Sequence, residues 1–161
     1  MKRLYLFFIS KLQLLADLPP LLFRFILAYG FYGPAMEKAT HFNDIVVWFG
    51  ETLHIPFPKL NAIMAVSTEC AGVVLMILGL ATRLISIPMM VIMLVAIKTV
   101  HLPDGWAACE TVRNADEVIE RVKHGVEIPV YYLCMLFWLL IAGPGKFSLD
   151  AIIKRKMIDE R

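Results

Sequence analysis

The chain has 161 residues, a net charge of +2 and only 19% charged residues, whereas 59% of its residues are hydrophobic. With a mean hydropathy of +0.69, little polar sequence remains to coat a soluble domain of this size. The composition therefore argues against a water-soluble protein or a nucleic-acid-binding protein. It predicts one all-α integral membrane domain that comprises residues 1–161.

The first segment, residues 1–17, is expected to form an amphipathic helix on the inner membrane surface. Leu4, Phe8 and Leu12 recur at helical spacing, with charged residues between them. The apolar piece is too short and has too few small residues after it for a cleaved signal peptide. Pro19 and Pro20 then end this helix and begin the next one.

Long apolar stretches follow, each close to the roughly 17 to 25 residues that a membrane-spanning helix needs. The predicted spans are Leu18–Met36, Leu60–Thr82, Leu84–Leu102 and Ile128–Gly145. They predict a four-transmembrane-helix bundle, in which the short turn "LATR" makes the second and third spans a tight antiparallel hairpin. The basic segment Ser148–Arg161 predicts a second surface helix, so amphipathic helices are expected at both termini.

The distribution of lysine and arginine predicts the orientation. Four spans place both termini on one side, and that side carries more of these residues, which indicates cytoplasmic termini and a multi-pass topology. Arg24, near the inner end of the first span, can extend to lipid headgroups. In the second outer loop, Asp116–Lys123 is expected to form a solvated helix that docks a partner or caps the bundle.

Two charged residues lie deep within the apolar stretches. Glu69 precedes Arg83 by fourteen residues and Lys98 follows it by fifteen, so both lie roughly 21 to 23 Å from the inner turn. Tyr32, Tyr131 and Tyr132 fall near this level, and Lys38, His101 and Glu127 fall one turn further out. Of the tyrosines, Tyr32 and Tyr131 are chosen as ligand residues. The sequence therefore predicts a polar layer in the outer half of the bundle.

Three interpretations of Glu69 stay open. It can neutralise Lys98 in an ion pair that fixes the helix register. It can be the proton donor or acceptor of a ligand site, in which Lys98 and the other residues of the polar layer bind the ligand. This interpretation is favoured because a position at membrane depth that needs no charge would carry an apolar residue. It can also be protonated and therefore uncharged.

No metal site is predicted, because the histidines show no metal-ligand spacing. A Cu(I) path built from methionines, Cys70 and His101 is the weaker alternative, since thioethers select that ion.

The segments "GPAMEK", "STECAGVVLMILGLATR" and "GPGKFSLD" resemble the DoxX family of small bacterial membrane proteins, and the resemblance extends from about Leu21 to Ile152. The segments "WFGETLHIPFP", "TVHLPDGW" and "HGVEIPVYYLCMLF" are similar to the HvfX-like subgroup, which is associated with maturation of copper-binding modified peptides. Lys38, Glu69, Arg83, His101, Glu127 and Asp150 match the family pattern by position. Lys98 and Cys70 depart from it, which favours Glu69 alone as the site.

The resemblance implies a redox-associated subunit in the bacterial inner membrane, with a quinone-like lipophilic ligand or a partner protein bound in the outer half of the bundle. The alternative is a non-enzymatic scaffold or small-solute carrier, linked to copper homeostasis or to peptide maturation. Besides the bilayer, the expected partner is a membrane redox protein, a scaffold protein or a second copy of the chain. The cofactor stays open between quinone and copper, and so does the question of catalysis.

Overall fold

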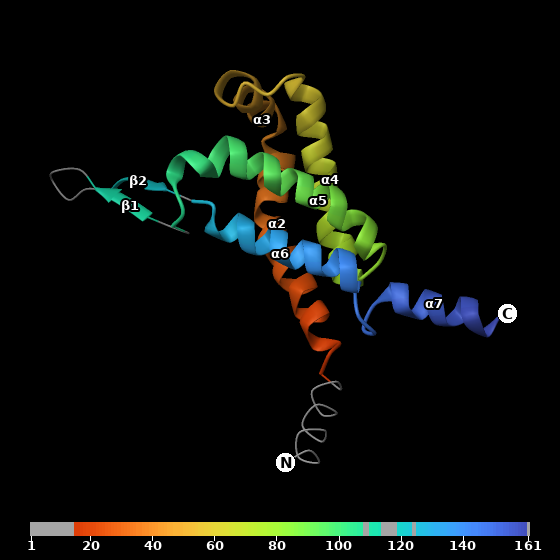
Figure 1. Ribbon diagram of the computed structural model, residues 1–161. Helices are drawn as coiled ribbons and strands as arrows, with labels where there is room; N and C mark the ends of the chain where they lie inside the picture. The colour runs from red at the N-terminus through yellow and green to blue at the C-terminus, as the bar shows by residue number, and fades with distance from the viewer. Residues whose placement is uncertain (1–14, 108–109, 114–118, 124, 161) are drawn as a thin grey trace, which may run out of the picture.

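A computed structural model describes residues 15–107, 110–113, 119–123 and 125–160 (Figure 1). Most of the surface helix expected over residues 1–17 lies outside these ranges. The predicted helical fold class is confirmed: the described part of the chain is mainly helical, with one short hairpin of strands.

Long helices build the body of the molecule, and shorter elements connect them. The long helices are α2 (Leu18–Thr40), α4 (Pro58–Leu78), α5 (Thr82–Ala96) and α6 (Glu127–Ala142). The shorter helical elements are α3 (Phe42–Val47), the π-helix η1 (Trp48–Thr52), the π-helix η2 (Ile97–His101), the 3-10 helix η3 (Leu102–Asp104) and α7 (Leu149–Asp159). We call the end of the bundle with α3, η1 and η3 the loop end, and the end with the α4–α5 turn and α7 the turn end (Figure 1).

The helix boundaries follow from local chemistry. Proline occupies the first turns of α2 and α4, where its missing N–H breaks no helical bond. Helix α4 ends at Leu78, four residues before the predicted end of the second span, because Gly79 is left-handed with φ of 64°. Leu80 N–H donates to the Leu75 carbonyl over 3.0 Å, which closes this helix in a Schellman motif.

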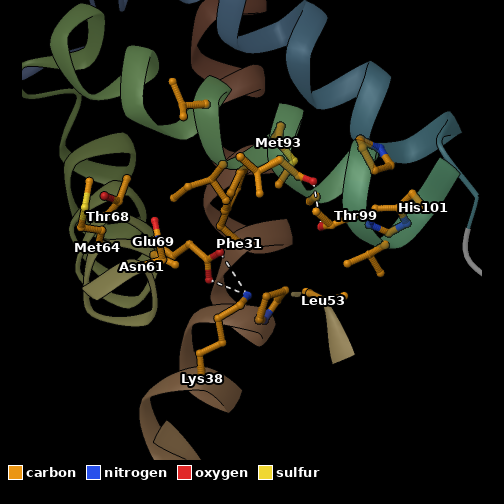
Figure 2. Close-up of a pocket in the computed structure, with 18 of the residues that line it drawn as sticks. Phe31, Lys38, Leu53, Asn61, Met64, Thr68, Glu69, Met93, Thr99 and His101 are labelled. Atoms are coloured by element: carbon orange, nitrogen blue, oxygen red, sulfur yellow. Dashed lines mark hydrogen bonds and ion pairs between the residues drawn. The ribbon is translucent and has the colours of Figure 1, made fainter. Parts of the chain in front are cut away.

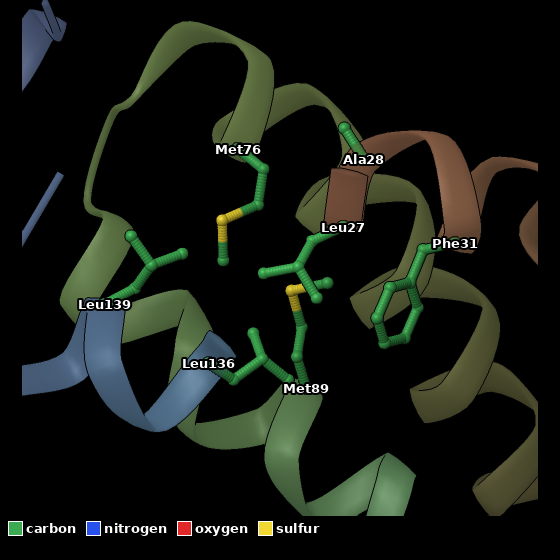
Figure 3. Packing of buried hydrophobic residues seen from close by; sticks show 7 residues of the cluster. All are labelled: Leu27, Ala28, Phe31, Met76, Met89, Leu136 and Leu139. Atoms are coloured by element: carbon green, nitrogen blue, oxygen red, sulfur yellow. The ribbon is translucent and has the colours of Figure 1, made fainter. Parts of the chain in front are cut away.

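The hydrophobic core lies where α2, α4, α5 and α6 meet (Figure 3). Its buried members are Leu27, Ala28, Phe31, Met76, Met89, Leu136 and Leu139. The flexible thioethers of the two methionines fill the irregular space at the centre of the bundle. On α6 the buried leucines lie three residues apart, which defines the inward face of a helix that is apolar all round.

Two glycines on α2 give a matched test of this packing. A Cβ at Gly30 would collide with the ring and hydroxyl of Tyr132, whereas a Cβ at Gly33 would meet no atom within 4 Å. We expect Gly30→Ala to lower the free energy of unfolding by about 1 to 3 kcal/mol through overpacking. Gly33→Ala should raise it by about 0.5 to 1 kcal/mol, because alanine favours a helix. Denaturant titration in detergent micelles measures both, and equal effects would contradict the packing described here.

At the turn end, the beginning of α7 is tied to the α4–α5 turn. The carboxylate of Asp150 accepts the N–H of Ala81 at 2.8 Å and that of Thr82 at 3.1 Å, and so caps helix α5. Ser148 caps α7 itself by accepting the Ala151 N–H. The predicted C-terminal helix is thus present, and its first turn is fixed to the bundle.

Arg24 does not reach toward lipid headgroups, and this expectation was wrong. Its side chain is only 1% exposed, and its Nη2 donates to the Phe147 carbonyl at 2.6 Å. The α4–α5 turn and the chain after α6 close over the guanidinium, which explains why it is buried. Arg24 is therefore a buried contact that joins α2 to the α4–α5 turn and to the chain after α6.

A second contact at the turn end joins Asp17, just before α2, to the segment after α6. Lys146 donates to Asp17 from its backbone N–H at 3.1 Å, and its Nζ lies 2.9 Å from the other carboxylate oxygen. This hydrogen bonding to Lys146 holds the pKa of Asp17 below its usual value. Its contribution to stability is therefore present above the usual carboxyl pKa and is lost as the pH falls through the lowered one.

The loop between η3 and α6 contains strands where a helix was predicted. Strand β1 (Glu110–Arg113) pairs antiparallel with β2 (Ile119–Lys123), with Thr111 opposite Val122 and an irregularity after Val112. The helix predicted over Asp116–Lys123 is therefore wrong for residues 119–123. β-branched residues are frequent in both segments, and their stiff side chains favour the extended backbone.

Candidate functional site

The strongest polar feature inside the bundle is an ion pair between α2 and α4. Lys38 Nζ donates to the two carboxylate oxygens of Glu69, at 3.1 Å to Oε1 and 2.9 Å to Oε2 (Figure 2). The Glu69 side chain is 2% exposed and the Lys38 side chain 18%. Because a buried charge without a partner is costly, each residue makes the position of the other tolerable.

One of the three interpretations paired Glu69 with Lys98, and this alternative was wrong, because the carboxylate is paired with Lys38. Lys98 is exposed and does not line the space around Glu69. Helical side chains lean toward the N-terminus of their own helix. The Glu69 side chain therefore leans toward the loop end. The Lys38 side chain, on a helix that runs in the opposite direction, leans toward the turn end, so that the two side chains meet. Lys98 lies in the π-helix η2, which has more residues per turn than an α-helix. Counting residues as in an α-helix therefore predicts the wrong helix face for Lys98.

A cavity of about 790 Å³ surrounds the ion pair, between the four long helices and the segment after α3. Its walls are mostly apolar. The side chains with polar groups that line it include Lys38, Asn61, Thr68, Glu69, Thr99, His101 and Tyr132. Figure 2 shows His101 and Thr99 across the cavity from Glu69. A mostly apolar space of this size with a few polar groups is typical of a small-molecule site.

Both π-helices of the described structure contribute to this cavity. Trp48 and Phe49 come from η1, and Thr99, Val100 and His101 come from η2. A π-helix is rare and occurs frequently at functional sites, because its extra residue per turn re-aims side chains. In η2 it brings Thr99 and His101 together to the cavity wall while Lys98 points away.

The predicted site residues separate into two groups. Lys38, Glu69 and His101 line the cavity. Tyr32 and Tyr131 are 57% and 49% exposed and do not line it. Tyr131 instead donates its hydroxyl to Glu127 at 2.6 Å, one turn away on the outer face of α6. The structure thus does not bring Tyr32, Lys98, Glu127 and Tyr131 to the ion pair.

Of the tyrosines expected near the level of Glu69, Tyr132 lines the cavity, although the sequence prediction chose its neighbour Tyr131 as a ligand residue. Tyr132 packs against Phe31 with ring centroids 5.8 Å apart and lines the cavity. It precedes Leu136 and Leu139 by four and seven residues, so it lies on the buried face of α6. That spacing was visible in the sequence, but the apolar residues around the whole helix hid which face is inward.

The fold and the site define a mainly helical protein with a mostly apolar cavity between its long helices. Two of its helical stretches, Pro58–Leu78 and Thr82–Asp104, are long and apolar enough to cross a membrane, and Glu127–Ala142 is a shorter apolar helix. The DoxX family model matches residues 20–102, which is more than half of the chain. The chain therefore belongs to the DoxX family.

An uncharacterized protein of Haemophilus influenzae is 29% identical over 142 residues, which cover 84% of this chain and 83% of that protein. No solved structure matches the chain. The family match includes most of α2 and all of α4 and α5, and therefore both residues of the ion pair.

Proposed function

We propose that this protein spans the bacterial inner membrane four times, with both termini in the cytoplasm, and that it binds a quinone-like lipophilic ligand in its cavity. The observation that carries the proposal is a mostly apolar cavity of about 790 Å³ with a buried carboxylate and a lysine on one wall. Helices α2 and α6 supply the remaining spans, because they pack with α4 and α5 around one core.

The chemistry of a quinone fits the walls. Its ring and tail are apolar and suit Phe31, Met93 and Pro129, while its carbonyl oxygens need hydrogen-bond donors and, on reduction, protons. Lys38 and His101 are donors on two different walls. In this proposal Glu69 gives or takes the proton, and a membrane redox partner supplies the electrons.

The alternative function is a scaffold or a small-solute carrier connected to copper, in line with the HvfX-like resemblance. Met64 and Met93 line the cavity, and thioethers select Cu(I). Cys70, the third expected member of a copper path, does not line it. Within the described ranges, no group of three or more histidine, cysteine or carboxylate residues could hold a metal ion.

Tryptophan fluorescence tests quinone binding directly, because Trp48 lines the cavity and Trp138 lies on the outer surface with 51% exposure. Decylubiquinone, a soluble quinone, should quench the purified protein saturably. Trp48→Phe should remove most of the saturable quenching, and Trp138→Phe should leave it intact.

Equal quenching in the two variants would mean that the quinone only partitions into the micelle, and the proposal would fail. Mass spectrometry of the small molecules extracted from the protein in mild detergent is the second measurement. A bound quinone supports the proposal. Uptake of Cu(I) into proteoliposomes, without quinone binding, would support the carrier instead.

A further inference from the structure

Lys38 lies between the internal cavity and a second, polar pocket on the surface. This surface pocket has a volume of about 470 Å³ and is lined by Glu37, Lys38, His41, Asp44, Ile45 and Trp48. Lys38 and Trp48 line both spaces. The surface pocket is at the loop end of the bundle, where α2 passes into α3.

The two side chains of the ion pair differ in their exposure to water. The Lys38 side chain is 18% exposed and the Glu69 side chain only 2%. Nζ nevertheless contacts both carboxylate oxygens. The lysine thus has one end on the buried carboxylate, and part of its side chain can be reached by water.

We infer that Lys38 is a proton relay between the surface pocket and Glu69. An Nζ–H bond of Lys38 breaks and an O–H bond forms on Glu69, which leaves a neutral amine beside a neutral carboxylic acid. The amine then takes a proton from water or from the His41 imidazolium in the surface pocket. One proton has moved from the loop end to Glu69, and no heavy atom has changed its bonding.

The residues of the surface pocket suit proton collection. An imidazole ring can accept a proton on one nitrogen and donate one from the other, and His41 lies three residues after Lys38 in the same pocket. The carboxylates of Glu37 and Asp44 attract protons to the pocket. Besides Lys38 and Glu69, the described titratable side chains that line the cavity include His101 from η2 and Tyr132 from α6, and neither of these two lines the surface pocket.

This inference rests on the proposed function, because it supplies the proton that Glu69 exchanges with the ligand. It also gives the site a direction: protons reach it from the loop end, which is the outer side of the membrane in the proposed topology.

Time-resolved infrared spectroscopy after a rapid drop in pH tests the relay on the full chain in nanodiscs without quinone. The carboxylic acid C=O band that disappears in Glu69→Gln reports protonation of Glu69. Lys38→Arg keeps the cation and its donors, but a guanidinium does not release a proton. We expect this variant to slow the appearance of the band by about a hundredfold. His41→Asn should slow it less, because water still enters the surface pocket.

His54→Asn is the matched control, since His54 is exposed at the same end and lines neither space. In the His54→Asn variant, Glu69 should be protonated at the same rate as in the unmodified protein. If Lys38→Arg unfolds at the normal temperature and yet protonates Glu69 as fast as the unmodified protein, the proton enters through the cavity and the relay is wrong. If decylubiquinone does not bind but Lys38→Arg slows protonation, the proposed function fails and the relay stands.

Discussion

Replacing Lys38 with methionine is expected to lower the free energy of unfolding by about 3 to 5 kcal/mol, because it leaves the Glu69 carboxylate buried without its partner. Glu69 is 2% exposed, and both of its oxygens accept from Lys38 Nζ. Glu69→Gln should cost less, about 1 to 3 kcal/mol, since Lys38 retains some access to water. Equilibrium unfolding in mixed micelles measures both variants.

Lys98→Met is the matched control. Lys98 is an exposed lysine of the same bundle, and its loss should change stability by no more than about 0.5 kcal/mol. The double variant Lys38→Met with Glu69→Gln should be more stable than the sum of the single losses predicts, because neither charge is left alone. Equal losses in Lys38→Met and Lys98→Met would contradict the assignment of the pair.

The same double variant separates charge balance from ligand chemistry. If Glu69 serves only to neutralise Lys38, the double variant should bind decylubiquinone no more weakly than Lys38→Met alone. If Glu69 contacts the ligand, Glu69→Gln should bind it more weakly while keeping its fold, and removing Lys38 should not restore binding. Full recovery in the double variant would end the proposal that Glu69 is a ligand-site residue.

Sequence alone located Glu69 but not its partner. A carboxylate in a long apolar segment needs compensation, and that argument requires no structure. The partner depends on the direction in which each side chain leans and on helix phase. Lys98 was placed by counting residues along an α-helix, whereas the chain changes to a π-helix at Ile97. No local pattern in the sequence indicated the change from α-helix to π-helix.

The helices themselves were predictable because length and hydropathy limit the choices. Their ends were less so: the end of α4 depends on the left-handed conformation of Gly79, and the second loop forms strands from residues whose spacing also fits a short helix. The cavity could not be foreseen from composition. It requires the long connection between α2 and α4 to fold back, so that Trp48 and Phe49 reach the same space as Glu69.

Gly79→Ala is the second substitution for which we expect a large effect. A residue with φ of 64° costs about 1 to 2 kcal/mol when it carries a Cβ. The added atom would also lie 2.6 Å from Cβ of Ser148 and would collide with the Arg24 guanidinium. Arg24 is 1% exposed and held by Phe147, so it has little freedom to move away. Together these effects should lower the free energy of unfolding by about 3 to 4 kcal/mol.

Ala81 in the same turn provides a control of opposite sign. It also has a left-handed backbone, with φ of 48°, so Ala81→Gly relieves strain and should leave stability unchanged or raise it by up to about 1 kcal/mol. Thermal unfolding in detergent compares the two variants. If Gly79→Ala loses no more than the strain of its backbone, the guanidinium of Arg24 can move aside. The turn end would then be a loose contact rather than the tight junction that fixes α7 to the bundle.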